Sequence, residues 1–434
     1  MGSGRLLAVA AYGVAQFFDD RLQAARVVAT LAGALTLLFT TLLASRLFGA
    51  VAAVIAGALY ILSPFAVVYD RLALSDGFLA ASLSGLMLAG LELFRAPESS
   101  LRRGMVGLCI LLAIVSKVSA VLFLLTLPLG ALLVARKKDG AFRSTAIAGL
   151  LGLLLASPML WFFWKNRGEI GDQHIIDPMI SGSIVSATLR DMSDWATAYF
   201  TPATLVAALV SLAVLRNASA LWLACSTVLP FCLFALFSQP WSARYVLPTL
   251  SPLLVLVAGG IATLVSRQTR SPGFPPALGL ALLASCQAVG FDAALFSDPS
   301  SAPFPRDDRT QLVTGWPAGY GVRELARRLQ SEAAAKPVAA LVDAGGLRTI
   351  PSGLAVLLGA RSNVRLIEGD FGSAEFQDGA RKRDRSVLAV IGPRSDGFDF
   401  KLQWRDLNPE RLEVYVRPGG EWAVTLFRIG ANRE

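Results

Sequence analysis

The sequence predicts a polytopic α-helical membrane protein, with about ten crossings, that carries a small C-terminal α/β domain. The chain has 434 residues, of which 54% are hydrophobic and only 16% are charged, whereas soluble domains average about 25% charged residues. Its mean hydropathy is +0.56. Apolar runs bounded by charges follow one another as far as Phe296. These observations exclude an ordinary cytosolic globule and a disordered chain.

The crossings follow from apolar runs near the length of about 20 residues that a spanning helix needs. The stretch from Gly104 to Ala135 is long for one crossing and short for two, and basic clusters on both sides favour two, with Lys117 near the turn. The predicted crossings are Leu22–Ser45, Ala50–Val68, Gly77–Phe94, Gly104–Ser116, Val118–Ala135, Thr145–Trp164, Ala198–Leu215, Ala220–Phe237, Tyr245–Val265 and Ala277–Phe296.

Loop charges predict the orientation of these crossings. One set of alternate loops is rich in Lys and Arg, and the other set is rich in Asp and Glu. Because basic residues accumulate on the cytoplasmic side, the first crossing starts outside and the chain leaves the last one outside. The net charge of +9 is therefore a topology signal. No basic helix or aromatic RNA-type motif accompanies it, so we expect the lipid bilayer as a partner and no nucleic acid.

The composition changes after residue 296, which predicts three regions: a membrane domain over 1–296, a linker over 297–314 and an α/β domain over 315–434. Pro299, Pro303 and Pro305 mark the linker. The domain is expected outside the membrane, in the extracytoplasmic space. Its predicted helices are Val322–Ser331 and Pro351–Leu358, and its predicted strands are Val338–Val342, Val364–Ile367, Val387–Ile391, Leu412–Val416 and Trp422–Phe427, the last two as a hairpin.

Cysteine and histidine usage argues against common metal and disulfide sites. The four cysteines lie inside apolar runs without a CxxC spacing, so they indicate neither a disulfide framework nor a zinc site. His174 is the one histidine, which excludes a multi-histidine centre. No cofactor is evident, and a requirement for a divalent metal ion stays open.

The densest polar cluster near an apolar run is the segment from Ser63 to Gly77, which contains Asp70, Arg71 and Asp76. Ionisable groups close to membrane spans are costly and need a reason. One interpretation is a solvated turn with an Arg–Asp pair, and the local sequence favours it. The other is a polar cluster at the mouth of a cavity, with Asp76 near a helix N-terminus.

Two further cations have the same pair of interpretations. Lys117 lies between two apolar stretches, and Arg244 precedes Tyr245 after another one. Each cation could extend its head group to the interface, with the aromatic residues as an anchor belt. Alternatively, two cations at outer helix ends, together with an Arg beside two carboxylates, suit a phosphate leaving group and a base for its acceptor.

The order of several segments resembles bacterial membrane glycosyltransferases related to protein O-mannosyltransferases and to the aminoarabinose transferase of lipid A, which share the C-type glycosyltransferase fold. The resemblance rests on the following segments: Ala25–Gly33 with Leu43–Gly49, Ser63–Asp76, the Ser116-Lys117 turn, Arg244–Pro248, and Gly315–Glu324. No single motif is decisive, but their order covers most of the chain.

This resemblance implies a multi-pass enzyme of the bacterial inner membrane that transfers a sugar from a polyprenyl-phosphate donor. The acceptor would be a hydroxyl on a lipid, glycan or protein, and the reaction would occur on the extracytoplasmic face. By position, Asp76 matches the carboxylate of the family's second outer loop. Arg71, Lys117 and Arg244 are the candidates for the donor phosphate, with Tyr245 and Asp70 beside them.

The resemblance also implies that a part of the family pattern is missing. The family places an extra crossing and a first outer loop with an acidic catalytic motif before Leu22, and here only Gly4–Phe18 resembles the end of that loop. Asp19 and Asp20 align after the motif. We expect a start codon assigned too far downstream, rather than a degenerate or partner-dependent relative.

Two other function classes remain open. A transporter or flippase of lipid-linked intermediates would often show internal repeats and charges at mid-membrane. The sequence has no visible repeat, and its charges gather at helix ends. A non-catalytic membrane protein that presents the α/β domain is compatible with the missing acidic motif.

Overall fold

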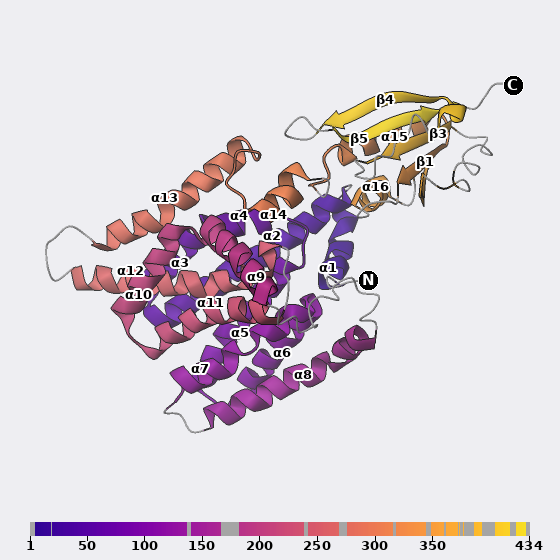
Figure 1. The fold of residues 1–434 in the computed structure, drawn as a ribbon. Helices are drawn as coiled ribbons and strands as arrows, with labels where there is room; N and C mark the ends of the chain where they lie inside the picture. The colour runs from indigo at the N-terminus through magenta and orange to yellow at the C-terminus, as the bar shows by residue number, and fades with distance from the viewer. Residues whose placement is uncertain are drawn as a thin grey trace. The chain divides into compact units, whose positions relative to one another are not determined.

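The computed structural model of the chain divides into two compact units, one of residues 1–19 and 23–305 and one of residues 20–22 and 306–434 (Figure 1). The division falls inside the predicted linker, where a short helix, α14 (Arg306–Arg309), stands. The structure describes residues 5–18, 20–136, 140–165, 182–237, 242–268, 276–315, 318–343, 349–359, 362–371, 373, 376, 386–392, 404–416 and 422–430.

The regular elements of the first unit's described part are all helices, as its apolar composition predicts. Two of its longer helices contain an interior proline, Pro158 and Pro230. Its α-helices are α1 (Arg5–Val14), α2 (Arg21–Phe48), α3 (Ala50–Ile61), α4 (Pro64–Tyr69), α5 (Asp76–Arg95), α6 (Ser100–Ser116), α7 (Thr126–Val134), α8 (Ala141–Lys165), α9 (Gly182–Trp195), α10 (Pro202–Leu215), α11 (Ala218–Phe237), α12 (Leu250–Gln268) and α13 (Pro276–Ser297).

Every predicted crossing coincides with helix, but several of the helices are shorter than a full span. Among the described residues, four helical stretches are long and apolar enough to cross a membrane, namely Arg21–Phe48, Asp76–Arg95, Ala141–Lys165 and Ala243–Arg267. A fifth is added if the pair Ser186–Phe200 and Pro202–Leu215, bent by 89°, counts as one span. The expected number of about ten crossings therefore stays a prediction.

Interruptions of the helices explain the short elements. The crossing predicted over Ala50–Val68 is divided because Pro64 cannot continue α3 and instead starts α4. Lys117 is extended, with φ of −162°, and separates α6 from a 3₁₀ segment over Val118–Phe123. Another 3₁₀ segment, Ala243–Thr249, precedes α12. At membrane depth, such irregular backbone is tolerated where protein or a water-filled cavity surrounds it.

Close helix packing in this unit depends on small residues. Helices α6 and α8 lie side by side, and Gly152 on α8 meets Ile110 and the backbone oxygen of Gly107 on α6. A Cβ atom at position 152 would lie 2.7 Å from the Cβ of Ile110 and 3.0 Å from that oxygen. Helices in lipid associate through such close contacts because lipid tails are as apolar as leucine.

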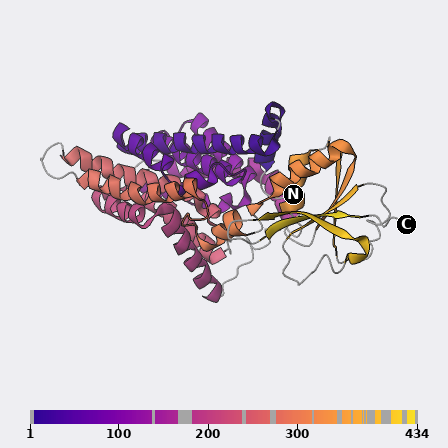
Figure 2. The same ribbon diagram turned by 90° about the horizontal axis from the view of Figure 1, so that it is seen from above.

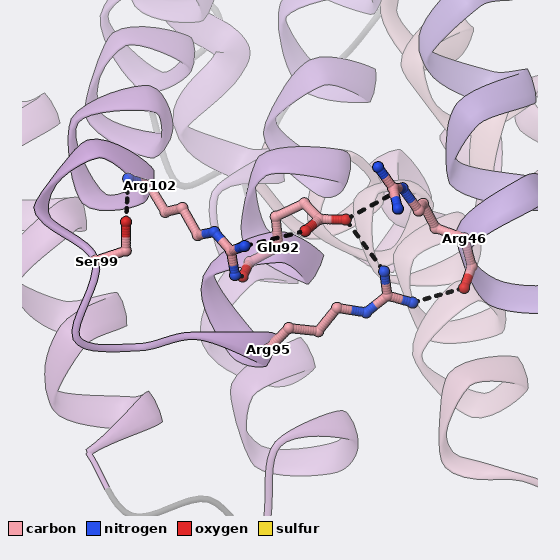
Figure 3. Close-up of polar contacts among 5 residues, drawn as sticks. All are labelled: Arg46, Glu92, Arg95, Ser99 and Arg102. Atoms are coloured by element: carbon pink, nitrogen blue, oxygen red, sulfur yellow. Dashed lines mark hydrogen bonds and ion pairs between the residues drawn. The ribbon is translucent and has the colours of Figure 1, made fainter.

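A charged cluster stands at the C-terminal end of α5. Glu92 forms ion pairs with Arg46 at 3.4 Å, Arg95 at 3.1 Å and Arg102 at 3.7 Å (Figure 3). Residues of α2, α5 and α6 therefore meet there. Arg95 also donates to the backbone oxygen of Arg46, and Arg102 to that of Glu92. These bonds tie the ends of three helices together.

The second unit contains the predicted α/β domain. A five-stranded mixed sheet has the order β2-β1-β3-β5-β4. Strand β1 is parallel to β2 and to β3, whereas β5 is antiparallel to β3 and to β4. The strands are β1 (Val338–Asp343), β2 (Val364–Gly369), β3 (Ser386–Ile391), β4 (Pro409–Val416) and β5 (Trp422–Ile429), and the helices are α15 (Val322–Ala335) and α16 (Thr349–Leu358). The hairpin pairing is confirmed, and its turn lies outside the described residues.

Both faces of this sheet are covered. Helices α15 and α16 pack on one face of the sheet, and Figure 2 shows the second unit's helices and strands from above. The even-numbered residues of β1, such as Ala340, are buried on that face. Leu341 points to the other face, against Phe371 and Trp404. Because a central parallel strand is buried on both sides, β1 reads in the sequence as a continuous apolar run.

Candidate functional site

Three irregular segments of the first unit bring polar residues together. They are the loop 70–75 before α5, the break at Lys117 after α6, and the 3₁₀ segment Ala243–Thr249 before α12. Helix α5 packs against the last of these, and α6 packs against α5. The second and third segments present Lys117 and Arg244 to Asp76, the first residue of α5.

Asp76 and Lys117 form a buried ion pair at the centre of this site. The ammonium Nζ of Lys117 donates to Oδ1 of Asp76 at 2.8 Å. The two side chains are only 5% and 4% exposed. Two charges that are removed from water in this way persist only when each neutralises the other. The Lys117 ammonium is therefore the partner that balances the buried carboxyl group of Asp76.

Tyr245 and Arg244 complete the polar group. The Lys117 ammonium lies 3.7 Å from the centre of the Tyr245 ring, within the range of a cation–π contact. The guanidinium carbon of Arg244 lies 5.6 Å from the same ring. Arg244 also interacts through its charge with Asp76. One aromatic face thus lies between two cations, both of which interact with a single carboxylate.

An aromatic cluster lies behind the 3₁₀ segment Ala243–Thr249. Phe65 of α4 stacks on Tyr199 with ring centres 4.8 Å apart, and Tyr69 meets both rings edge-on. The hydroxyl of Tyr69 is 3.5 Å from Oγ of Ser242. These contacts hold α4 and the start of the 3₁₀ segment in a fixed arrangement.

Asp70 occupies a separate place against α2. Tyr60 donates a hydrogen bond of 2.8 Å to its Oδ2, and its Oδ1 is buried without a hydrogen-bond partner among the described residues. Burial raises the pKa of Asp70 to about 7, against the opposing effect of the Tyr60 hydrogen bond. Gly33 permits this approach, because a Cβ atom there would lie 2.5 Å from the carboxyl carbon.

Arg71 points to a different neighbourhood. Its guanidinium carbon lies 5.3 Å from the centre of the Phe296 ring, and its charge interacts with Asp292 and with Arg26. The structure therefore brings together Asp76, Lys117, Arg244 and Tyr245 of the predicted site residues. It does not bring Asp70 or Arg71 into contact with them.

Sequence reasoning missed several residues that the structure adds. Tyr60 and Gly33 enclose Asp70, and Asp292 and Arg26 face Arg71. They were missed because apolar helices carry them, and no local motif marks which helix faces meet. Asp292 offered the one usable signal, since an acid within an apolar run is costly without a partner.

The described residues contain no group of three or more His, Cys, Asp and Glu side chains that could hold a metal ion. His174, the one histidine of the sequence, lies outside the described residues. The metal requirement therefore stays open.

One family model matches the N-terminal part of the chain. Residues 6–162 match the sequence model of the dolichyl-phosphate-mannose-protein mannosyltransferase family. This range includes Asp76 and Lys117 and ends before Arg244. No curated protein matches the chain.

Solved structures share the fold over almost the whole chain. ArnT from Cupriavidus metallidurans in the apo state has a TM-score of 0.61 and 17% identity, with 98% of this chain and 87% of that chain covered. The same protein bound to undecaprenyl phosphate has a TM-score of 0.61 and 16% identity, with coverages of 99% and 88%. AglB from Archaeoglobus fulgidus, an oligosaccharyltransferase in complex with an inhibitory peptide and a dolichol-phosphate, has a TM-score of 0.50 and 13% identity, with coverages of 97% and 66%. At these identities the likeness is one of fold.

Proposed function

We propose that the chain is a glycosyltransferase that transfers a sugar from a polyprenyl-phosphate donor to an acceptor hydroxyl on the extracytoplasmic face of the membrane. The observation that carries the proposal is the buried Asp76–Lys117 pair, with Tyr245 and Arg244 beside it. The fold and the family match add support, because ArnT binds undecaprenyl phosphate and AglB binds a dolichol-phosphate in their solved structures.

The chemistry assigns a role to each charge. The acceptor oxygen forms a bond to the anomeric carbon, and the bond from that carbon to the phosphate oxygen breaks. The electron pair of the broken bond stays on the lipid phosphate, where the cations Lys117 and Arg244 stabilise it. The hydroxyl proton passes to a carboxylate, and Asp76 is the residue placed to accept it or to orient the hydroxyl.

The ion pair explains how one site could serve both steps. While Lys117 is bonded to Oδ1, the ammonium balances the carboxylate of Asp76. When a phosphate arrives, its charge competes with Asp76 for the ammonium, which frees the carboxylate to contact the acceptor hydroxyl. The Tyr245 ring meanwhile keeps the ammonium in place.

A transfer assay with the purified full chain tests the proposal. The donors would be undecaprenyl-phosphate sugars labelled in the sugar, and the acceptors would be lipids, glycans and proteins of the bacterial envelope. We expect label to reach one acceptor class and undecaprenyl phosphate to be released in equal amount. Movement of the donor lipid across the vesicle membrane without sugar transfer would instead support the transporter. If neither transfer nor lipid movement occurs, the non-catalytic protein is supported.

A matched pair of variants locates the chemistry. Asp76→Asn and Glu92→Gln each convert one acid of α5 to its amide, at opposite ends of the same helix. We expect Asp76→Asn to lower the rate by at least about a hundredfold, the lower range for a positioned acid or base, and Glu92→Gln to leave it unchanged. Equal rates in both variants at matched amounts of folded protein would contradict the role of Asp76.

Donor binding is the corresponding test for the cations. Lys117→Ala and Arg244→Ala should raise the Kd for undecaprenyl phosphate more than the KM for the acceptor, because both cations are assigned to the phosphate. An unchanged donor titration would remove that assignment.

A further inference from the structure

A pocket that is separate from the Asp76–Lys117 site opens beside the start of α2. It has a volume of about 490 Å³, and its lining includes Arg26 and Arg71 together with the apolar residues Val27, Leu31 and Leu72. Arg26 lies in the second turn of α2, and Arg71 lies in the loop after α4. Two chain segments thus each contribute one guanidinium to a single opening.

Neither guanidinium group forms a hydrogen bond or an ion pair within 4 Å with another residue of the described ranges. The guanidinium of Arg71 lies over the Phe296 ring. Burial lowers the pKa of Arg71, the charge of Asp292 opposes this effect, and the like charge of Arg26 adds to it by a smaller amount. Like charges that face one opening without a bound acid are stabilised when an anion enters.

The walls of the pocket suit a hydrocarbon chain. Val27, Leu31 and Leu72 line it, and the Leu31 side chain is 58% exposed on a helix that is long and apolar enough to span a membrane. A small soluble anion would fill the cationic part and leave this apolar wall uncovered. A molecule with a phosphate at one end and an acyl chain at the other covers both.

We propose that this pocket binds a phosphate monoester carried on an acyl-chain lipid, at a site distinct from the one formed by Asp76 and Lys117. Two guanidinium groups match the two negative charges and the several acceptor oxygens of a phosphate monoester. The two sites also differ in access, because Arg26 and Arg71 are exposed, whereas Lys117 is 4% exposed. The proposal does not depend on the proposed function.

Lipid binding to the full chain in phosphatidylcholine nanodiscs tests it. Native mass spectrometry would measure the Kd for phosphatidic acid, a phosphate monoester with two acyl chains, and separately that for undecaprenyl phosphate. We expect Arg26→Gln and Arg71→Gln each to weaken phosphatidic acid about tenfold, since each removes one charge-assisted contact. Neither should change undecaprenyl phosphate binding, and Lys117→Met should show the reverse pattern.

The chain offers a matched control. Arg136 and Arg216 line another pocket, of about 670 Å³, with leucines around them. Arg136→Gln and Arg216→Gln therefore remove the same charge from a similar setting. We expect them to leave phosphatidic acid binding unchanged. An equal loss in the Arg26, Arg71 and Arg216 variants would overturn the proposal, because it would mean a general attraction of the basic protein for anionic lipid.

Two further probes separate the sources of the phosphate. Inorganic phosphate should compete with phosphatidic acid only weakly, because it lacks the acyl chain, and full competition would overturn the requirement for a lipid. Phosphatidylglycerol, a phosphate diester with a single charge, should bind at least several-fold more weakly. Binding of equal strength, equally sensitive to Arg26→Gln, would overturn the specificity for a monoester.

Discussion

Removal of one partner from the Asp76–Lys117 pair should destabilise the protein strongly. The charges are joined at 2.8 Å and their side chains are 5% and 4% exposed, so water cannot solvate a charge that is left alone. Breaking a buried pair in this way costs about 3–5 kcal/mol. We therefore expect Lys117→Met and Asp76→Asn each to lower the free energy of unfolding by that amount.

The double variant distinguishes this reasoning from a simple loss of contacts. Asp76→Asn with Lys117→Met leaves neither charge of the pair, so its cost should be smaller than the sum of the two single costs by at least about 2 kcal/mol. Unfolding in mixed micelles, followed by tryptophan fluorescence, measures all four proteins. If the two costs simply add, or if each is below about 1 kcal/mol, the pair is not desolvated and the reasoning is refuted.

Three other predictions concern parts of the first unit away from this pair. Asp70 has a pKa of about 7 in the folded chain and an ordinary one when unfolded. Because the folded state binds the extra proton, the thermal midpoint of unfolding should fall as the pH rises from 5 to 8. Asp70→Asn should flatten that dependence, and an equal slope in the variant would contradict the assignment. Gly152→Ala should destabilise by about 1–3 kcal/mol, since its Cβ meets Ile110 at 2.7 Å, whereas Gly149→Ala on the same helix meets nothing within 4 Å and should be neutral or stabilising by thermal unfolding. Glu92→Gln should lower the free energy of unfolding by less than about 1 kcal/mol, because the arginine partners of Glu92 are 32–57% exposed. A loss above about 1 kcal/mol that persists at high salt would contradict this.

The stability and activity predictions for Asp76→Asn must be compared together. A variant that is destabilised but still folded at the assay temperature loses transfer through chemistry, which the rate per folded molecule measures. The Glu92→Gln variant provides the reference for both properties, because it removes the same charge from the other end of α5.

Composition and periodicity determined the architecture of this protein to a large extent. Helices stand at every predicted crossing, and helices and strands of the C-terminal domain stand where alternating and helical patterns indicated them. This works because burial of apolar residues in lipid or in a sheet depends on runs within the chain, which the sequence displays directly. The chain breaks were only partly visible. The basic clusters around Gly104–Ala135 predicted the break at Lys117, whereas the single crossing predicted over Ala50–Val68 is interrupted before Pro64.

The candidate site shows where local sequence stops being sufficient. Asp76, Lys117, Arg244 and Tyr245 were selected because charges near membrane spans need a reason, but nothing local showed that they meet. The same reasoning placed Arg71 with them, and the structure instead turns Arg71 toward Arg26 and Phe296. Six positions separate Asp70 from Asp76, and one carboxyl faces Tyr60 while the other faces Lys117. The residue types and their nearness to apolar runs are properties of the chain, but the pairing of charges depends on which helix faces pack together, and only the tertiary structure decides that.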